Sequence, residues 1–446
     1  MQNNLGMGNA KLYDSGYRYP VVVGSTQGSN YMGYPTVVIY GHYDVQPIDP
    51  IDLWTFKPFD MEKTKLEGYG EVFTGRGVSD NKGGSFSAIA ALAILNSVLD
   101  GGLKALPINI LLVIEGEEEI GSPGYKDFLI NNKQLFENAK IVISADGGQP
   151  HEDRGALELS LRGMTAMELS VKGANTDLHS GTFGGSFLNP IVALTRLIST
   201  FHDPVTNKIA VESFYDGVED LSVDEKEELE TTMGMDDNEM ALKLGVGEMI
   251  GEDGYTTAER VTVRPTLELV GVYGGFREEG IKTVLPSEAH AKISIRTVKG
   301  QEPTKLFELV TKHVEKYAPT LAPGLAVKVT SISKGERAYT SNRDSIAFKI
   351  AGEVLDDIYG KEHTTSRAGG SIGAVSQMHE VLGLDTICFA FSASDDFVHA
   401  PNERMRTSRL SLGQRAYIRL ILDLADAYNE GEPIPFTTTF APKVDM

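Results

Sequence analysis

Acidic and histidine side chains lie where apolar runs of this sequence end or where predicted helices begin. TVVIYGHYDV carries His42 and, two residues later, Asp44; KIVISADGG ends in Asp146; INILLVIEGEEEIG ends in consecutive glutamates; DTICFAFSASDDFVHAPNE repeats the pattern. The carboxyl ends of strands converge at one edge of an open α/β sheet, and carboxylates and imidazoles are ligands for zinc or manganese. The sequence therefore predicts a two-metal hydrolase site built from His42, Asp80, Glu118, Glu119, Asp146 and His399.

Each motif taken alone has a simpler explanation. GHYDVQP is compatible with a strand end and a hydrogen-bonded histidine, GRGVSDNKGG with a loop and helix cap, EGEEEIGS with a solvated charge run, and SADGG with a turn. Asp44, however, has the spacing that lets a carboxylate orient His42 as a ligand. Five separate termini that all offer ligands favour the metal site over these explanations.

The order of apolar segments predicts two domains. YPVVVG, TVVIYG, INILLVI and KIVISA alternate with predicted helices over 85–99 and 125–136, a pattern typical of doubly wound sheets. ALELSLRG and TAMELSVKG then alternate apolar and polar residues, as antiparallel strands do. We expect an α/β domain in two segments, 1–160 and 336–446, interrupted by an inserted α+β domain over 161–335.

Composition excludes several classes of function. The chain has 446 residues and a formal charge of −21, which argues against binding to nucleic acid or to an anionic membrane. No apolar run reaches membrane-spanning length, and the N-terminus lacks the pattern of a signal peptide. The single cysteine, Cys388, lies in an apolar run and fits a reducing compartment. The expected location is the cytoplasm. The acidic segment over 216–250 is predicted to be helical and has no catalytic signature.

Eight motifs occur in the order found in one enzyme family. They are GHYDVQP with the following Trp54, Pro58 and Phe59, then GRGVSDNKGG, EGEEEIGS, DLHSGTFGG, KTVLP, ISIRTV, GGSI and VHAPNE. In these residues the chain resembles the carnosinase and cytosolic nonspecific dipeptidase branch of the aminoacylase, acetylornithine deacetylase and succinyl-diaminopimelate desuccinylase metallopeptidases. The resemblance implies a dimetal exopeptidase-type catalytic domain, and it implies that the inserted domain is a lid and dimerisation domain.

The resemblance also implies roles for the ligands. His42, Asp80 and Asp146 would hold one metal ion, and Asp80, Glu119 and His399 the other, so that Asp80 bridges the two. Glu118 would be the general base, and the Asp80–Asn81 peptide bond is expected to be cis. Two divalent ions per chain are expected, with zinc first and manganese or cobalt as alternatives.

Further positions match residues that contact substrate in the family. His179 resembles the lid histidine that supplies an oxyanion donor from the opposite subunit of a homodimer. The positions that would hold the free carboxylate of a small peptide are Thr283, Arg296, Arg367, Gly370 and Ser371, since guanidinium and loop N–H groups suit that ligand. Arg296 alone could be a surface residue and GGSI a turn.

Two departures from the family pattern affect the expected function. The branch usually reads REGGSI, whereas this chain has Ala368 after Arg367, so recognition of a free N-terminal amine is in question. The segment before GHYDV is also short, and we expect the family's N-terminal helix and leading strand pair to be truncated or missing.

These motifs leave four interpretations of the function. A dipeptidase is favoured, and an N-acyl-amino-acid amidohydrolase with the same mechanism is the main alternative. A serine hydrolase is remote: Ser371 lies in a G-x-S-x-G pattern followed by Asp395 and His399, but the preceding EHTTSRAGG is polar where the nucleophile elbow needs an apolar strand. A catalytically silent relative would have lost a ligand or the base, and none is missing.

Overall fold

The computed structural model describes residues 5–26, 33–233, 236–333 and 335–429. Over this range the chain forms two compact units. The first contains the described residues up to Leu157, Asn342–His363 and the described residues from Val381 onward, and the second contains Glu158–Ser341 and Thr364–Glu380. The expected α/β class is confirmed. Among the described residues, no helix has the length and apolar character needed to cross a membrane.

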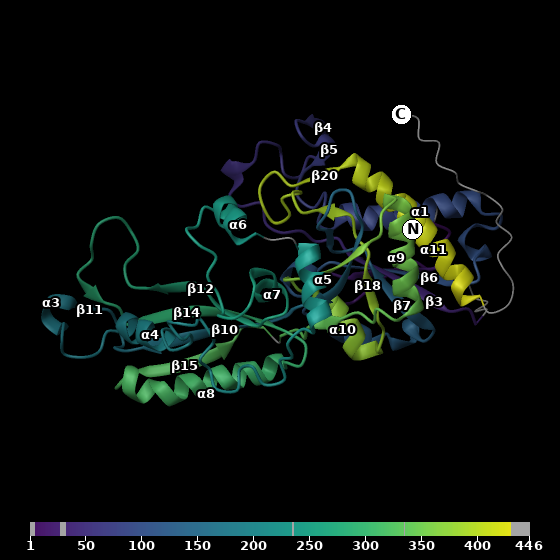
Figure 1. Cartoon of the computed structure of the whole chain (residues 1–446). Coiled ribbons are helices and arrows are strands. Elements are labelled where there is room, and N and C mark those ends of the chain that lie inside the picture. Colours follow the sequence, from purple (N-terminus) through teal and green to yellow (C-terminus); the bar gives the residue numbers. More distant parts are fainter. Residues whose placement is uncertain (1–4, 27–32, 234–235, 334, 430–446) are drawn as a thin grey trace. The chain divides into compact units, whose positions relative to one another are not determined.

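A mostly parallel sheet forms the centre of the first unit (Figure 1). Its strand order is β1 (Lys11–Tyr13), β2 (Val21–Ser25), β6 (Asn109–Glu115), β3 (Thr36–His42), β7 (Ala139–Ser144) and β18 (Thr386–Cys388). β3 runs parallel to both β6 and β7, and β18 runs parallel to β7. Every residue of β3 and β6 is buried, which explains why these strands appear in the sequence as continuous apolar runs.

In the part of the first unit that the structure describes, four α-helices accompany the sheet: α1 (Lys82–Val98), α2 (Tyr125–Asn131), α9 (Ile346–Tyr359) and α11 (Thr407–Tyr428). α11 packs against both α1 and α9. α1 begins three residues before the predicted helix, and the helix predicted over 125–136 ends earlier and continues as a 3-10 turn, Lys133–Phe136. Cys388, which the sequence places in an apolar run, is buried and belongs to β18.

Three features of the first unit differ from expectation or were not predicted. The leading strand pair is present as β1 and β2, which pair antiparallel, so the expectation that it would be missing is wrong. A three-stranded sheet joins β4 (Glu62–Leu66), β5 (Gly70–Thr74) and β20 (Arg404–Arg406). The short parallel pair β8 (Gly148–Gln149) and β19 (Ser392–Ala393) follows β7.

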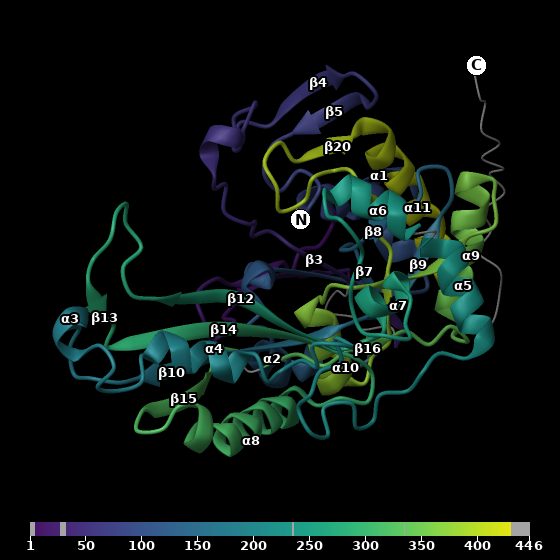
Figure 2. The same ribbon diagram turned by 60° about the vertical axis from the view of Figure 1, so that its left-hand side comes forward.

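The second unit is built on an antiparallel sheet of order β12 (Thr266–Gly274), β14 (Glu288–Thr297), β10 (Gly163–Lys172) and β15 (Ala326–Ser331). Buried and partly buried residues alternate strictly along most of β10, because only one face of this sheet is covered. α4 (Pro190–Ile198) packs on β10 and β14, and α8 (Pro303–Leu321) packs on β10 and β15, as Figures 1 and 2 show.

Smaller elements of the second unit lie beyond the two ends of β14. Near its start are the ribbon of β11 (Leu178–His179) and β13 (Val284–Leu285) and the short helix α3 (Ser180–Phe183). The acidic segment forms α5 (Val223–Met233) and α6 (Asp237–Leu244), followed by α7 (Thr257–Thr262). β9 (Ala156–Leu161) pairs with β16 (Tyr339–Thr340) and β17 (Thr364–Ala368), and α10 (Gly373–Leu382) follows β17.

Candidate metal centre

His42 stands at the carboxyl end of the central strand β3 and is almost completely buried. Its Nδ1 lies 3.2 Å from a carboxylate oxygen of Asp44. The two oxygens of Asp44 also accept hydrogen bonds from the backbone N–H groups of Glu118, at 3.3 Å, and Glu119, at 3.0 Å. Asp44 therefore connects the end of β3 to the turn after β6, and it leaves Nε2 of His42 facing the other acidic side chains.

Asp80 lies between the two histidines. Its Oδ1 is 3.1 Å from Nε2 of His42, and its Oδ2 is 2.8 Å from Nε2 of His399. Burial alone would raise the pKa of Asp80, but hydrogen bonds from His399 and His42 outweigh it and hold that pKa well below its usual range. The Asp80–Asn81 peptide bond is cis, as the family resemblance predicts. Each oxygen of one carboxylate thus faces a different imidazole.

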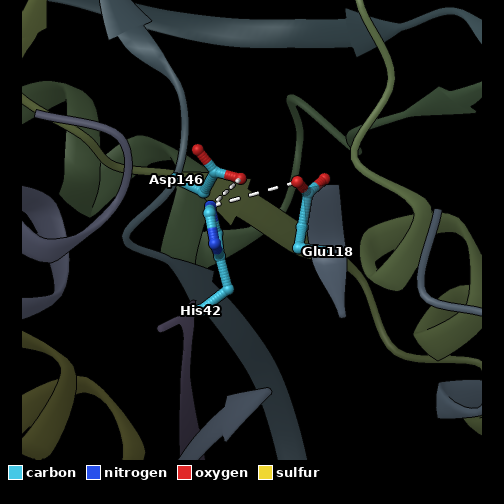
Figure 3. A group of neighbouring side chains, drawn as sticks. All are labelled: His42, Glu118 and Asp146. Atoms are coloured by element: carbon cyan, nitrogen blue, oxygen red, sulfur yellow. Dashed lines mark ion pairs between the residues drawn. The ribbon is translucent and has the colours of Figure 1, made fainter. Parts of the chain in front are cut away.

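Glu118 and Asp146 approach His42 from two other strand ends (Figure 3). Their carboxylate oxygens lie 4.0 Å and 3.8 Å from Nε2 of His42, respectively. Burial, with the neighbouring charge of Asp146, raises the pKa of Glu118 well above its usual value. Burial likewise raises the pKa of Asp146 to about 6. The protein by itself therefore supplies too little positive charge to balance the charges of these two carboxylates.

Glu119 and His399 form the other side of the cluster. Oε2 of Glu119 lies 3.2 Å from Nε2 of His399. Gln46 holds both oxygens of Glu119, because its side-chain amide donates to Oε2 at 2.8 Å and its backbone N–H donates to Oε1 at 3.1 Å. Hydrogen bonds to Asp80 and Glu119 raise the pKa of His399 to about 10.

The donor set fits divalent cations. Two groups of residues place ligand atoms within 4.8 Å of one another: His42 with Glu118 and Asp146, and His42 with Asp80 and Glu119. Four carboxylates and two imidazoles converge, and a cluster of partly buried carboxylates requires compensating positive charge. Imidazole nitrogen and carboxylate oxygen are the ligands that zinc and manganese accept. Glu118 lies within ligand range as well, so distance alone does not separate a base from a ligand at this position.

The candidate carboxylate-binding residues belong to the second unit, and only some of them meet. Nη1 of Arg296, near the end of β14, donates to Oγ of Ser371 at 3.2 Å. The carbonyl of Gly370 accepts a hydrogen bond from the backbone N–H of Arg162 at 3.0 Å. Arg367 is instead bound to Glu225 of α5, with Nη2 2.9 Å from the carboxylate. Arg296 therefore contacts the turn that precedes α10 and that contains Gly370 and Ser371.

His179 and Thr283 lie together at the other end of β14. His179 pairs with Val284 in the ribbon, and the backbone N–H of Ser180 donates to the carbonyl of Thr283 at 2.9 Å. Thr283 lies in the segment before β14, which begins at Glu288, whereas Arg296 is the next-to-last residue of that strand. A strand of this length spans roughly 30 Å at about 3.3 Å per residue. Figures 1 and 2 show β11, β13 and α3 at the opposite end of β14 from α10.

Four residues with direct contacts to these groups were not singled out in the sequence: Gln46, Arg162, Glu336 and Glu403. Arg162 donates from Nε to the carbonyl of Gly369 at 2.8 Å and so fixes the GGSI turn. The carboxyl group of Glu336 covers the same turn, since a Cβ on Gly373 would lie 2.7 Å from its Oε1. Burial raises the pKa of Glu336 to about 7, while a hydrogen bond to Ser371 and the charge of Arg296 act in the opposite direction.

The structure contains only part of the geometry that a serine hydrolase requires. Ser371 lies between the polar strand β17 and the helix α10. β17 forms a strand because it pairs with β9 and because its Arg367 binds Glu225 of α5. The stretch before Ser371 is thus a strand, but it is polar and only partly buried and so is not the apolar strand that a nucleophile elbow requires. Asp395, however, is engaged by both Nη atoms of Arg406 at 2.7 Å, and His399 faces Asp80 and Glu119. The Asp–His pair of a triad is not formed.

Comparisons with known proteins agree with the metal cluster. A model of peptidase family M20/M25/M40 matches residues 38–423. The chain is 30% identical to the Cys-Gly metallodipeptidase of Candida albicans over 87% of this chain and 78% of that protein. It is 28% identical to the human Beta-Ala-His dipeptidase over 88% of this chain and 75% of that protein.

Solved structures show the same relationship. An M20 family metallo-carboxypeptidase from Sulfolobus solfataricus superimposes with a TM-score of 0.80 at 28% identity, covering 94% of this chain and 91% of that one. The dipeptidase Dug1p from Saccharomyces cerevisiae also gives 0.80, at 26% identity, with 94% and 89% covered. The resemblance to the dipeptidase branch is confirmed, and the chain belongs to peptidase family M20/M25/M40 as a relative of its metallodipeptidases.

Proposed function

We propose that this protein is a dipeptidase that hydrolyses the amide bond of dipeptides or short peptides with a free C-terminal carboxylate. The observation that carries the proposal is Asp80, whose two oxygens face His42 and His399 separately. We assign His42, Asp80 and Asp146 to a first metal position and Asp80, Glu119 and His399 to a second metal position. Zinc is the first expectation, with manganese or cobalt as alternatives, because the donors are nitrogen and oxygen.

The chemistry follows from this assignment. Two divalent cations held there would polarise the scissile carbonyl and lower the pKa of an attacking water. Glu118 accepts the proton of that water and returns it to the leaving amine. A carboxyl group with a raised pKa, as Glu118 has, is suited to both transfers near neutral pH. Asp44 keeps His42 oriented by its contact with Nδ1.

Substrate recognition is assigned to the second unit. Arg296, Ser371 and the N–H groups around Gly370 bind the free carboxylate of the substrate, for which a guanidinium fork is suited. Arg367 acts through the GGSI segment that follows it, since its own guanidinium is paired with Glu225. Ala368 gives the second candidate, an N-acyl-amino-acid amidohydrolase, because the family's glutamate on the amine-binding side is absent.

A substrate panel tests the function directly. Dipeptides and N-acyl amino acids with the same C-terminal residue are assayed after the protein is stripped with a chelator and reloaded with zinc, manganese or cobalt. We expect no turnover in the stripped protein, recovery with about two ions per chain, and preference for dipeptides. Preference for the acyl substrates would favour the amidohydrolase. Full activity of demonstrably metal-free protein would contradict both.

The ionisation of Glu336 predicts a pH effect on substrate affinity. Its pKa of about 7 leaves the group mostly neutral at pH 6 and mostly ionised at pH 8. The ionised carboxylate competes with the substrate carboxylate for Arg296 and Ser371. We expect KM for dipeptides to rise about three- to tenfold over that range, which corresponds to roughly 0.7–1.4 kcal/mol of partly screened repulsion.

Glu336→Gln should flatten that rise in KM, because the amide stays neutral at both pH values. Glu302→Gln is the matched control, since the Glu302 carboxylate pairs with Arg337 on the surface of the same unit. The readout is the ratio of KM in the variant to KM in the wild type at each pH. An equal rise in all three proteins would show that Glu336 does not face the bound carboxylate.

We also propose a cytoplasmic homodimer in which the inserted domain over 161–335, which lies within the second unit, is a lid and dimerisation domain. His179 and Thr283 lie at the end of β14 opposite Arg296, so they would complete the site of a partner subunit, where His179 donates to the oxyanion. Support comes from the edge strand β12, which exposes Val270 and Val272 at 64% and 51% of their surface. An exposed apolar edge strand is a surface with which another chain can pair.

Complementation between inactive variants tests this arrangement. His179→Ala and Glu118→Ala proteins should each be nearly inactive. After mixing, dissociation and reassociation, each mixed dimer would contain one site with both defects and one site with neither. Random pairing in a C2 dimer should restore about a quarter of wild-type activity. If subunit exchange is demonstrated and no activity returns, His179 acts within its own chain or has no catalytic role.

A further inference from the structure

Glu403 is a fully buried carboxylate four residues after His399. All four of its described hydrogen bonds come from one short segment that ends at Asp80. Oε1 accepts from the backbone N–H groups of Ser79 at 2.9 Å and Asp80 at 3.0 Å. Oε2 accepts from the backbone N–H of Gly77 at 2.8 Å and from Nη1 of Arg76 at 2.7 Å. One side chain therefore binds the main chain on which Asp80 is carried.

These contacts join two parts of the chain that are far apart in sequence, since Asp80 and Glu403 are separated by 323 positions. Asp80 and His399 face each other at 2.8 Å, yet neither belongs to a strand or helix that would fix its place. His399 has a positive φ of 61°, so its loop is not held by repetitive structure. The backbone of Glu403 adds a further connection, because its carbonyl accepts from the N–H of Gly75 at 3.0 Å.

The charge of Glu403 is balanced within the same segment. Arg76 and Glu403 expose 1% and 0% of their side chains. Arg76 also donates from Nη2 to the carbonyl of Ala400 at 3.2 Å and lies over the ring of Trp54. A buried ion pair contributes little net stability relative to apolar residues of the same size. Its geometric effect is large here, because both partners connect the His399 loop to the segment before Asp80.

We propose that Glu403 is a positioning residue that fixes Asp80 relative to His399 and thereby preforms the second metal position. The inference rests on the proposed function, which assigns Asp80, Glu119 and His399 to that position. Glu403 touches neither metal nor substrate. It acts through the peptide groups of Ser79 and Asp80, while Gln46 restrains the remaining ligand, Glu119, from the other side.

Glu403→Gln is the direct test, because each carboxylate oxygen accepts two hydrogen bonds and the amide nitrogen of glutamine would face two donors. Manganese binding to metal-free protein is measured by titration. The electron paramagnetic resonance spectrum of the loaded protein then distinguishes magnetically coupled ion pairs from isolated ions. We expect one ion to bind as in the wild type and the second about ten- to a hundredfold more weakly, as for other residues that support metal ligands. The coupled spectrum should be replaced by that of an isolated ion.

Asp396→Asn is the matched control. Asp396 is equally buried and lies in the same loop, but its Oδ2 accepts from the side-chain hydroxyl of Ser79 at 2.7 Å and not from the Asp80 peptide. Both variants change a buried carboxylate to an amide, so thermal unfolding of the metal-free proteins measures their structural cost. If Asp396→Asn weakened the second ion as much as Glu403→Gln, the effect would be general loop destabilisation and the proposal would be overturned.

A second variant covers a failure of Glu403→Gln to fold. Glu403→Asp keeps the charge opposite Arg76 but is too short to reach both ends of the segment, and it should also weaken the second ion selectively. Unchanged affinity for the second ion in a folded variant at position 403 would overturn the inference while the proposed function stands. A wild-type protein that binds no pair of ions would contradict the proposed function itself.

Discussion

Asp80→Ala is expected to abolish tight binding of both ions and to lower kcat/KM by at least about a thousandfold. The two oxygens of Asp80 face His42 and His399 at 3.1 Å and 2.8 Å, so a single truncation removes a proposed ligand from both proposed metal positions. Metal ions supply several kcal/mol of charge stabilisation in the transition state, and each loss of about 1.4 kcal/mol is a tenfold loss in rate.

Metal content after dialysis and the kinetics of dipeptide hydrolysis measure this effect. Asp60→Ala is the control, because Asp60 is exposed and pairs only with Lys57 among its described ion-pair contacts. The control should keep wild-type metal content and activity. If Asp80→Ala retained two tightly bound ions, Asp80 would not be the bridging ligand, and the assignment of both metal positions would have to be revised.

Glu118→Gln and Glu119→Gln are expected to fail in different ways although the residues are adjacent. Glu118→Gln should lower kcat by about 10²- to 10⁴-fold, the usual effect of removing a general base, and should leave metal content near normal. Glu119→Gln should reduce occupancy of the second metal position, because Glu119 lies 3.2 Å from His399 and is held by Gln46.

Metal content decides between the two roles, since Glu118 also lies within ligand range of His42 and Asp146. Each variant serves as the control for the other: both remove one negative charge from the same turn. The opposite outcome, with metal lost from Glu118→Gln and retained in Glu119→Gln, would mean that the base and the ligand are exchanged in EGEEEIGS.

The candidate metal ligands at the strand ends could be proposed from the sequence for a definite reason. His42 is the last residue of β3, and Glu118, Glu119 and Asp146 follow within a few residues of the ends of β6 and β7. These apolar strands are buried over most or all of their length. Such strands are continuous apolar runs in the sequence, and their carboxyl ends share one edge of the sheet. Polar residues placed there are conspicuous. The helices α1, α9 and α11 were predictable on similar grounds, from long segments with an apolar face.

Elements whose stability depends on distant partners were not predictable. β17 is polar, and it forms a strand because it pairs with β9 and because Arg367 binds Glu225 of α5. The β4, β5 and β20 sheet unites residues near position 70 with residues near position 405. Neither arrangement leaves a local period in the sequence, since tertiary contacts override local preference in such strands.

The sequence by itself determined the class of fold, the family and a set of candidate metal ligands, because those depend on local apolar patterning and on motif order. Only the tertiary structure decided how these residues are held. It showed that Glu403 binds the Asp80 peptide, that Gln46 restrains Glu119 and that Arg367 is paired with Glu225. It also separated His179 from Arg296 along β14. Hydrogen bonds and ion pairs between remote positions depend on the folded path of the chain, and one sequence does not encode that path as a local pattern.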